Sequence, residues 1–161
     1  MIEFRKPTAD DGKEMFRIVR ESKVLDVNSE YSYLLWGKYF SDTSILAVSD
    51  NEVIGFISGF IPPDQADTLF IWQVAVDGSF KGHGIATKLI AQLLARVNKE
   101  RSIEFIEATV TPSNIPSRRL FDGFAQKNNT KCVVSECFTE KQFSGEGHEA
   151  EFTFRIGPIF N

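Results

Sequence analysis

The spacing of apolar residues along the chain has two periods, which predict where strands and helices lie. Continuous or alternating apolar runs predict strands, and recurrence every three to four residues predicts helices. The most regular helical period covers residues 82–97, where apolar side chains form one stripe. The predicted strands are residues 2–6, 45–48, 53–61, 69–76, 103–110, 132–134 and 151–156.

Capping and turn residues place the ends of these elements. Thr8 precedes two aspartates and should cap a first helix, while Asn28 or Ser29 should cap a second helix that runs to Phe40. The dipeptide Asp50-Asn51 predicts a hairpin. Ser113 is expected to cap a short helix that contains Pro116 in its first turn. The order of elements predicts an α+β fold of mainly antiparallel strands, with helices in the crossovers.

Length and charge narrow the class of protein. The 161 residues suit one domain, 1–161, and the net charge of −4 disfavours nucleic acid but suits a cationic substrate. No apolar run reaches the ~18 residues of a membrane helix, and the first residues lack a signal-peptide pattern, so we expect a cytoplasmic protein away from membranes. The two cysteines should be reduced and partly buried. Without a CxxC or Cys/His cluster, we expect no metal.

A glycine-rich turn follows the apolar strand at 69–76 and opens the long helix. Glycines let the backbone approach a ligand, and the free N–H groups of a helix start favour phosphate, to which Lys81 adds a positive charge. A plain strand–turn–helix is one alternative. A dinucleotide fold is another, since Gly82-x-Gly84-x-x-Thr87 is a partial fingerprint with Glu104 downstream. Two preceding hairpin strands and the short remaining chain argue against that fold.

The motif Lys81-Gly82-His83-Gly84-Ile85-Ala86 resembles the acetyl-coenzyme A motif of the GNAT acyltransferase superfamily. A second motif, Asn114-x-x-Ser117-x-x-Leu120-Phe121, resembles that family's Asn-x-x-Ala-x-x-Leu-Tyr. The resemblance implies the GNAT fold and acetyl-CoA as co-substrate. It also implies a set of cofactor-binding positions on the strand, the turn and the second motif: Val74, Ala75, Val76, Lys81, Gly82, His83, Gly84, Ile85, Ala86, Thr87, Asn114 and Ser117. His83 occupies a variable motif position and should be exposed.

Four further segments resemble the diaminobutyrate acetyltransferases of ectoine biosynthesis. They cover residues 25–35, 67–76, 107–114 and 147–151, and the likeness spans about residues 3–160. The resemblance implies transfer of an acetyl group to the γ-amine of L-2,4-diaminobutyrate, by direct attack in a ternary complex, and a homodimer. Phe138, Phe143, Phe152 and Phe154 could form the dimer face or belong to the core. The alternatives are an acetyltransferase for another small amine and a non-catalytic coenzyme A-binding domain.

The general base must come from outside the apolar strand. Many relatives carry a glutamate just before Val74-Ala75-Val76, but here Ile71, Trp72 and Gln73 offer no carboxylate. The candidates are Asp26, Glu107, His148 and Glu151. We favour Glu151 as base or amine anchor, with His148 as a supporting donor or relay. For Glu107, a structural hydrogen bond is an equal alternative to catalysis.

A diamino acid also needs groups that hold its second amine and its carboxylate. Asp26 suits the α-ammonium, and the Trp72 indole N–H and the Tyr31 hydroxyl suit the carboxylate. Tyr33, Trp36 and Tyr39 fit either the pocket or ordinary packing, and Arg118 or Arg119 fits either a cofactor phosphate or solvent. Phe121 stands where many relatives have a tyrosine that protonates the leaving thiolate, and phenylalanine has no proton to donate.

Overall fold

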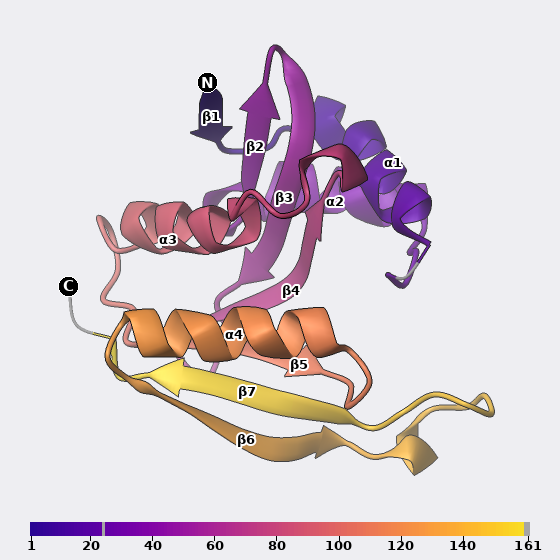
Figure 1. Cartoon of the computed structure of the whole chain (residues 1–161), viewed down its shortest axis with the longest axis vertical. Helices are drawn as coiled ribbons and strands as arrows, with labels where there is room; N and C mark the ends of the chain where they lie inside the picture. The colour runs from indigo at the N-terminus through magenta and orange to yellow at the C-terminus, as the bar shows by residue number, and fades with distance from the viewer. Residues whose placement is uncertain (24, 160–161) are drawn as a thin grey trace.

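A computed structural model describes residues 1–23 and 25–159, which form one mixed seven-stranded sheet with helices on both faces (Figure 1). The sheet order is β1-β2-β3-β4-β5-β7-β6, and only β4 and β5 pair in parallel. The predicted α+β class is therefore confirmed. The strands are β1 (Ile2–Arg5), β2 (Ile45–Ser49), β3 (Glu52–Phe60), β4 (Thr68–Val76), β5 (Phe105–Val110), β6 (Lys131–Phe138) and β7 (Glu151–Gly157).

Four α-helices cover the sheet in two layers. The helices are α1 (Gly12–Ser22), α2 (Glu30–Tyr39), α3 (Ile85–Val97) and α4 (Ile115–Lys127), and the short 3-10 segments are η1 (Ala9–Asp11), η2 (Ser41–Thr43), η3 (Gly78–Phe80) and η4 (Glu140–Gln142). One core cluster joins α1 and α2 to β2, β3 and β4, and a larger one joins α3 and α4 to the other face. None of the helices in the described part of the chain is long and apolar enough to cross a membrane.

Capping and turn residues determine where most helices and strands begin or end. Ser29 caps α2 by accepting from the Ser32 N–H at 3.2 Å, and Asp50 and Asn51 form the hairpin turn with φ of 49° and 65°. Thr8 forms a capping box with Asp11, which opens η1 before α1 begins. The long helix starts at Ile85 instead of residue 82 because Gly82 and Gly84 adopt positive φ, which no right-handed helix contains.

Two predictions about the C-terminal half were wrong. Asn114, not Ser113, caps α4 by accepting from the Ser117 N–H at 3.2 Å, and the helix is 13 residues long rather than short. The Ser113 hydroxyl instead donates to the Glu149 carboxylate. Of the phenylalanines considered for a dimer face, Phe154 is buried in the core and Phe152 packs against it, whereas Phe138 is 45% exposed.

Candidate active site

The sheet splits where β4 and β5 pair in parallel. β4 pairs with β5 over Thr68–Ile71 and Phe105–Ala108, whereas its pairing with β3 continues to Val76 (Figure 1). Beyond Ile71, the β5 side of β4 has no strand partner among the described residues, so its backbone groups are free to bind an extended ligand. The split therefore leaves Val74-Ala75-Val76 without a strand partner on that side, and the cofactor role that the motif resemblance implies for this segment remains a prediction.

A β-bulge in β4 accompanies the split. The register with β3 shifts between Ser58 and Gly59, so that Trp72 is an extra residue on β4. Ile71 and Val74 pack on the α3 side, while Trp72 and Gln73 both contact α2. The bulge therefore directs two consecutive side chains toward α2 and the loop before it, because it breaks the alternation of the strand.

The glycine turn forms an open cradle at the start of α3. Gly82 and Gly84 have φ of 85° and 72°, and a Cβ added at either would meet nothing within 4 Å. Gly84 is the N-cap, so the N–H groups of the first turn of α3 have no partner within the helix. Lys81 and His83 are exposed beside them. This geometry fits a diphosphate, and the phosphate role of these residues remains a prediction.

The turn is held from behind by α1. Asp77 caps η3 by accepting from the Ser79 N–H at 2.9 Å, and it also pairs with Arg17 of α1 at 3.2 Å. Arg17 further bonds the Glu14 and Glu21 carboxylates and donates to the carbonyl of Val53 at 3.1 Å. Sequence reasoning missed both η3 and this Arg17 cluster, because ion pairs between distant segments leave no local pattern.

Carboxylates from two distant segments lie within electrostatic range of each other. Burial is the main cause that raises the pKa of Glu151, and the charges of Asp26 and Glu149 add to it, while a hydrogen bond from Thr109 and the charge of His148 oppose it. Asp26 thus lies within electrostatic range of Glu151, although they are far apart in sequence. The structure brings together the predicted residues Asp26, His148 and Glu151.

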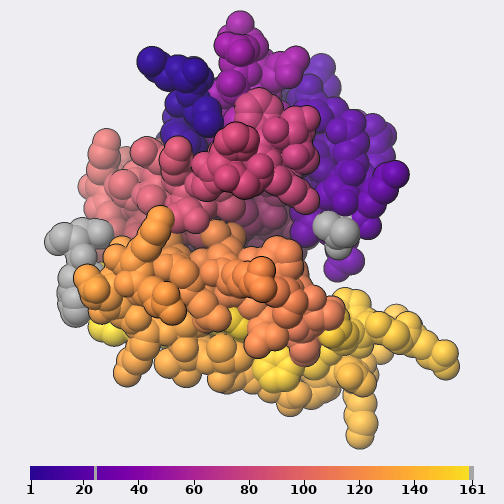
Figure 2. Space-filling model, viewed as in Figure 1, coloured from indigo at the N-terminus to yellow at the C-terminus, as the bar shows by residue number. Residues whose placement is uncertain are grey.

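The loop between β6 and β7 presents His148. Its ring stacks on Phe143 with centroids 3.7 Å apart, and its Nδ1 lies 2.7 Å from the Glu149 carbonyl oxygen. Figure 2 shows this loop projecting from the rest of the molecule. The Ser113–Glu149 contact ties the loop to the start of α4.

Glu107 has a structural partner. Its carboxylate accepts from the Arg155 guanidinium, which also bonds the Thr68 hydroxyl at 3.3 Å and lies 3.8 Å from the centre of the Phe105 ring. The ion pair crosses from β5 to β7 at the registered positions. This arrangement favours the structural alternative for Glu107, whose catalytic role remains a prediction.

The aromatic residues divide by environment. Trp72 stacks on Trp36 with ring centroids 4.9 Å apart, and Tyr33 is fully buried with its hydroxyl 3.0 Å from Gln73 Oε1. Tyr31 and Tyr39 are 67% and 66% exposed. Phe121 is buried in the core. Full burial favours the packing alternative for Tyr33, and the substrate contacts expected of Trp72 and Tyr31 remain predictions.

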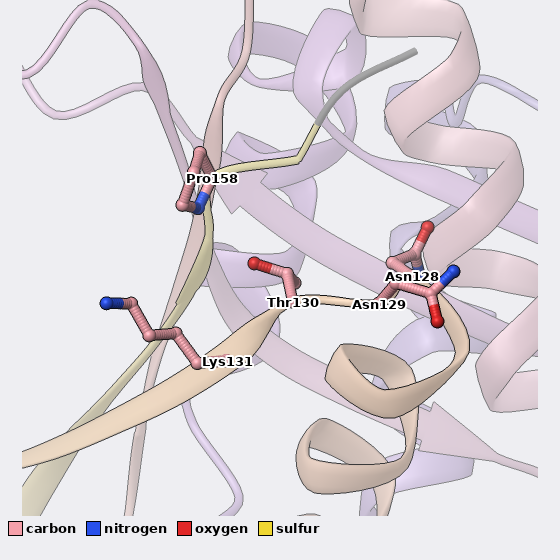
Figure 3. A pocket seen from close by; sticks show the side chains of 5 residues that line it. All are labelled: Asn128, Asn129, Thr130, Lys131 and Pro158. Atoms are coloured by element: carbon pink, nitrogen blue, oxygen red, sulfur yellow. The ribbon is translucent and has the colours of Figure 1, made fainter.

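Two hollows in the surface lie away from Asp26, His148 and Glu151. One hollow of about 520 Å³ is lined by Asn128, Asn129, Thr130, Lys131 and Pro158 (Figure 3). It adjoins the C-terminal end of α4, about 20 Å along the helix from Asn114. A smaller one of about 180 Å³ lies between α1 and the turn, beside Asp77 and Lys81. Among the described residues, no three His, Cys, Asp or Glu side chains gather as a metal site.

A split parallel strand pair, a β4 bulge and a glycine cradle at a helix start define an acyl-coenzyme A-binding fold. The acetyltransferase (GNAT) family model matches residues 12–124, and the chain belongs to this family. The predicted GNAT membership is confirmed, and with it an acetyl-CoA-dependent acetyltransferase.

Relatives with a shared enzyme name match this chain over nearly its full length. It is 46% identical over 158 residues to the L-2,4-diaminobutyric acid acetyltransferase of Halalkalibacterium halodurans, covering 98% of this chain and 82% of that protein. It is 42% identical over 159 residues to the enzyme of that name from Streptomyces coelicolor, covering 98% of this chain and 94% of that protein.

A solved structure is similar over the whole chain. The diaminobutyrate acetyltransferase EctA from Paenibacillus lautus, in complex with its substrate L-2,4-diaminobutyric acid and coenzyme A, superposes with a TM-score of 0.92. It is 40% identical, and the match covers 100% of this chain and 97% of that one. Ard1 from Thermoplasma volcanium, at 15% identity and a TM-score of 0.81, shares the fold.

Proposed function

We propose that this enzyme transfers the acetyl group of acetyl-CoA to the γ-amine of L-2,4-diaminobutyrate, a step of ectoine biosynthesis. One observation carries the proposal: Asp26, whose backbone carbonyl is bonded to Gln73 of β4, lies within electrostatic range of Glu151 at the start of β7. A substrate with two ammonium groups needs an acid for each. The full-length similarity to diaminobutyrate acetyltransferases supports the same substrate.

Glu151 is the proposed base. An alkylamine has a pKa near 10, so a neutral amine at pH 7 costs roughly 4 kcal/mol, and attack on a thioester requires loss of a proton from the nitrogen. Partial burial raises the pKa of Glu151, which makes its carboxylate a better proton acceptor than an exposed one. His148, whose charge also acts on Glu151, is the supporting donor or relay.

The remaining substrate contacts follow the same geometry. Asp26 holds the α-ammonium and so leaves the γ-amine for reaction. Trp72, from the β4 bulge, and Tyr31, from the first turn of α2, donate to the carboxylate. Each group comes from an element beside the split, which supports one common pocket.

Acetyl-CoA, which supplies the activated thioester, fits along β4 and the glycine turn. The free edge at Val74–Val76 pairs with its extended arm, the first N–H groups of α3 with Lys81 receive the diphosphate, and Asn114 and Ser117 border the cofactor. Direct attack is favoured because burial raises the pKa of the Cys132 thiol to about 11, which makes it a poor nucleophile. Since Phe121 cannot donate a proton, the proton for the leaving thiolate comes from water, Tyr31 or another nearby tyrosine, or else coenzyme A departs as the thiolate, which a thiol pKa of ~8.5 allows.

We further propose a homodimer that works in the cytoplasm. Cys132 and Cys137 are both free thiols, which suits a reducing compartment that supplies acetyl-CoA. Exposed apolar side chains on β6 support pairing with a second copy.

The decisive experiment measures acetyl transfer to a panel of amines. Purified enzyme is supplied with acetyl-CoA and diaminobutyrate, ornithine, spermidine or an aminoglycoside, and the product is assigned by NMR. We expect the highest kcat/KM for diaminobutyrate and acetylation at its γ-nitrogen. A higher kcat/KM for another amine would replace the substrate, and coenzyme A binding without transfer to any amine would identify a non-catalytic binding domain.

A further inference from the structure

The Gln73 side chain bonds two segments at once. Its Oε1 lies 3.0 Å from the Tyr33 hydroxyl on α2, and its Nε2 donates to the Asp26 backbone carbonyl at 2.9 Å. Tyr33 is fully buried, whereas Asp26 lies in the irregular loop between α1 and α2. Gln73 therefore connects a fixed part of the core to a loop at the active site.

The chemistry of the two partners fixes the orientation of this amide. A backbone carbonyl only accepts, so it requires the NH2 end of Gln73. The Tyr33 hydroxyl then donates to the oxygen end. The reversed amide would bring its own oxygen close to the Asp26 carbonyl oxygen, two acceptors with no proton between them.

The β4 bulge makes this contact possible. Because Trp72 is the extra residue, Gln73 projects toward α2 instead of toward α3. Trp72 beside it stacks on Trp36 of the same helix. The bulge and α2 thus hold Gln73 in place before any substrate binds.

We infer that Gln73 is a positioning residue for substrate selection: it holds the Asp26 loop against β4, so that the Asp26 carboxylate faces the second ammonium of a diamine. This inference rests on the proposed function for the identity of the diamine. The loop contact itself does not depend on the substrate. A glutamate at this position would lack the N–H that the Asp26 carbonyl requires and would add a third negative charge near Asp26 and Glu151.

The test is Gln73→Met, which keeps the length of the side chain and removes both hydrogen bonds. We expect the KM for diaminobutyrate to rise about fivefold to tenfold, as loss of one or two hydrogen bonds predicts, while the KM for acetyl-CoA stays within about twofold. Discrimination between diaminobutyrate and ornithine should fall, because the α-ammonium anchor is no longer fixed. Gln126→Met, on the exposed last turn of α4, is the matched control and should leave all of these unchanged.

A second readout is independent of activity. Hydrogen exchange of the peptide that contains residues 25–29 should be faster in Gln73→Met than in the wild type. Tyr33→Phe removes only the buried hydroxyl that donates to Gln73. It should speed hydrogen exchange and raise the diaminobutyrate KM, but less than Gln73→Met does. If Gln73→Met does not fold, Tyr33→Phe replaces it in the test. Unchanged exchange and unchanged diaminobutyrate KM would overturn the inference. A wild type that ignores diaminobutyrate would instead refute the proposed function, and the exchange result would still decide whether Gln73 holds the loop.

Discussion

The acidic side chains of this protein differ mainly in what surrounds their charge. Asp42 is exposed, and a hydrogen bond from Lys6 lowers its pKa. Asp77 is partly exposed, and hydrogen bonds from the Ser79 N–H and from Arg17 lower its pKa. Glu151 is the one carboxylate in the described part of the chain whose pKa is clearly raised, chiefly by burial. A partly buried acid with a raised pKa is suited to accept a proton from a substrate.

Glu151→Gln should therefore lower kcat by about 10²–10⁴-fold, the usual range for loss of a general base, with a smaller change in acetyl-CoA KM. In the wild type, the base is active only when deprotonated, so kcat/KM should fall as the pH drops through its raised pKa, above the ordinary value of 4.5. The variant should lose this acidic limb of the profile. Steady-state kinetics across pH measure both effects.

The matched control is Glu146→Gln, an exposed glutamate of the loop that precedes β7, which should keep the wild-type profile. If Glu151→Gln retains more than about a tenth of wild-type kcat with the same acidic limb, the base lies elsewhere. Glu107, one of the three other predicted candidates beside Asp26 and His148, would then be tested together with its Arg155 partner.

The sequence predicts those site residues that belong to a recognisable motif or are of a rare residue type. The candidates Asp26, Glu151 and His148 were named from resemblance, and the structure brings them together. The Gln73–Tyr33 pair was not found, because a glutamine is an ordinary residue in a strand and its partners lie 40 and 47 positions away. The one usable signal was the need of any buried tyrosine hydroxyl for a partner.

At the scale of elements, helix α1 supports the phosphate turn. Arg17 connects α1 to the start of β3 through Val53 and to the turn through Asp77, which caps η3. The charges and hydrogen bonds of Glu14, Asp77 and Glu21 raise the pKa of Arg17, so it stays fully protonated. The turn is thereby held in one position before the cofactor arrives.

Arg17→Met should raise the KM for acetyl-CoA about threefold to tenfold, since the loss of one charged hydrogen bond loosens the turn, and should leave the KM for diaminobutyrate nearly unchanged. This split is opposite to that expected for Gln73→Met. Arg20→Met, one turn further along α1 and exposed, is the control. Equal KM values for acetyl-CoA in both variants and the wild type would exclude a role for Arg17 in the turn.

Element order was largely predictable, and element distortions were not. The strands, the hairpin at Asp50-Asn51 and the cap at Ser29 follow from local patterns that the structure confirms. The bulge at Trp72 could not be predicted from the sequence. It lies in a nearly continuous apolar run, and such a run buries apolar side chains in either strand register. Ser113 was named as a cap because serine suits that role, but its hydroxyl binds Glu149 and Asn114 takes the cap.

For the whole molecule, the C-terminal edge of the sheet is unprotected. β6 is an eight-residue edge strand whose neighbour β7 occupies one side only. Val133, Val134 and Phe138 on it are 52%, 50% and 45% exposed. Edge strands in native proteins are usually short, charged or covered, and an exposed apolar one marks a pairing site. A second copy of this chain is the partner that the proposed homodimer provides.

We therefore expect the wild type to elute at twice the chain mass of 18.2 kDa in size-exclusion chromatography with light scattering at micromolar concentration. Replacing Val133 and Val134 by lysine should give the single-chain mass, because lysines block edge-to-edge pairing and lose their hydration when covered. The control replaces Ala91 and Gln92, exposed on α3, by lysine and should stay dimeric. If both lysine pairs leave the dimer intact, the interface lies away from β6, and a monomeric wild type would reject the dimer altogether.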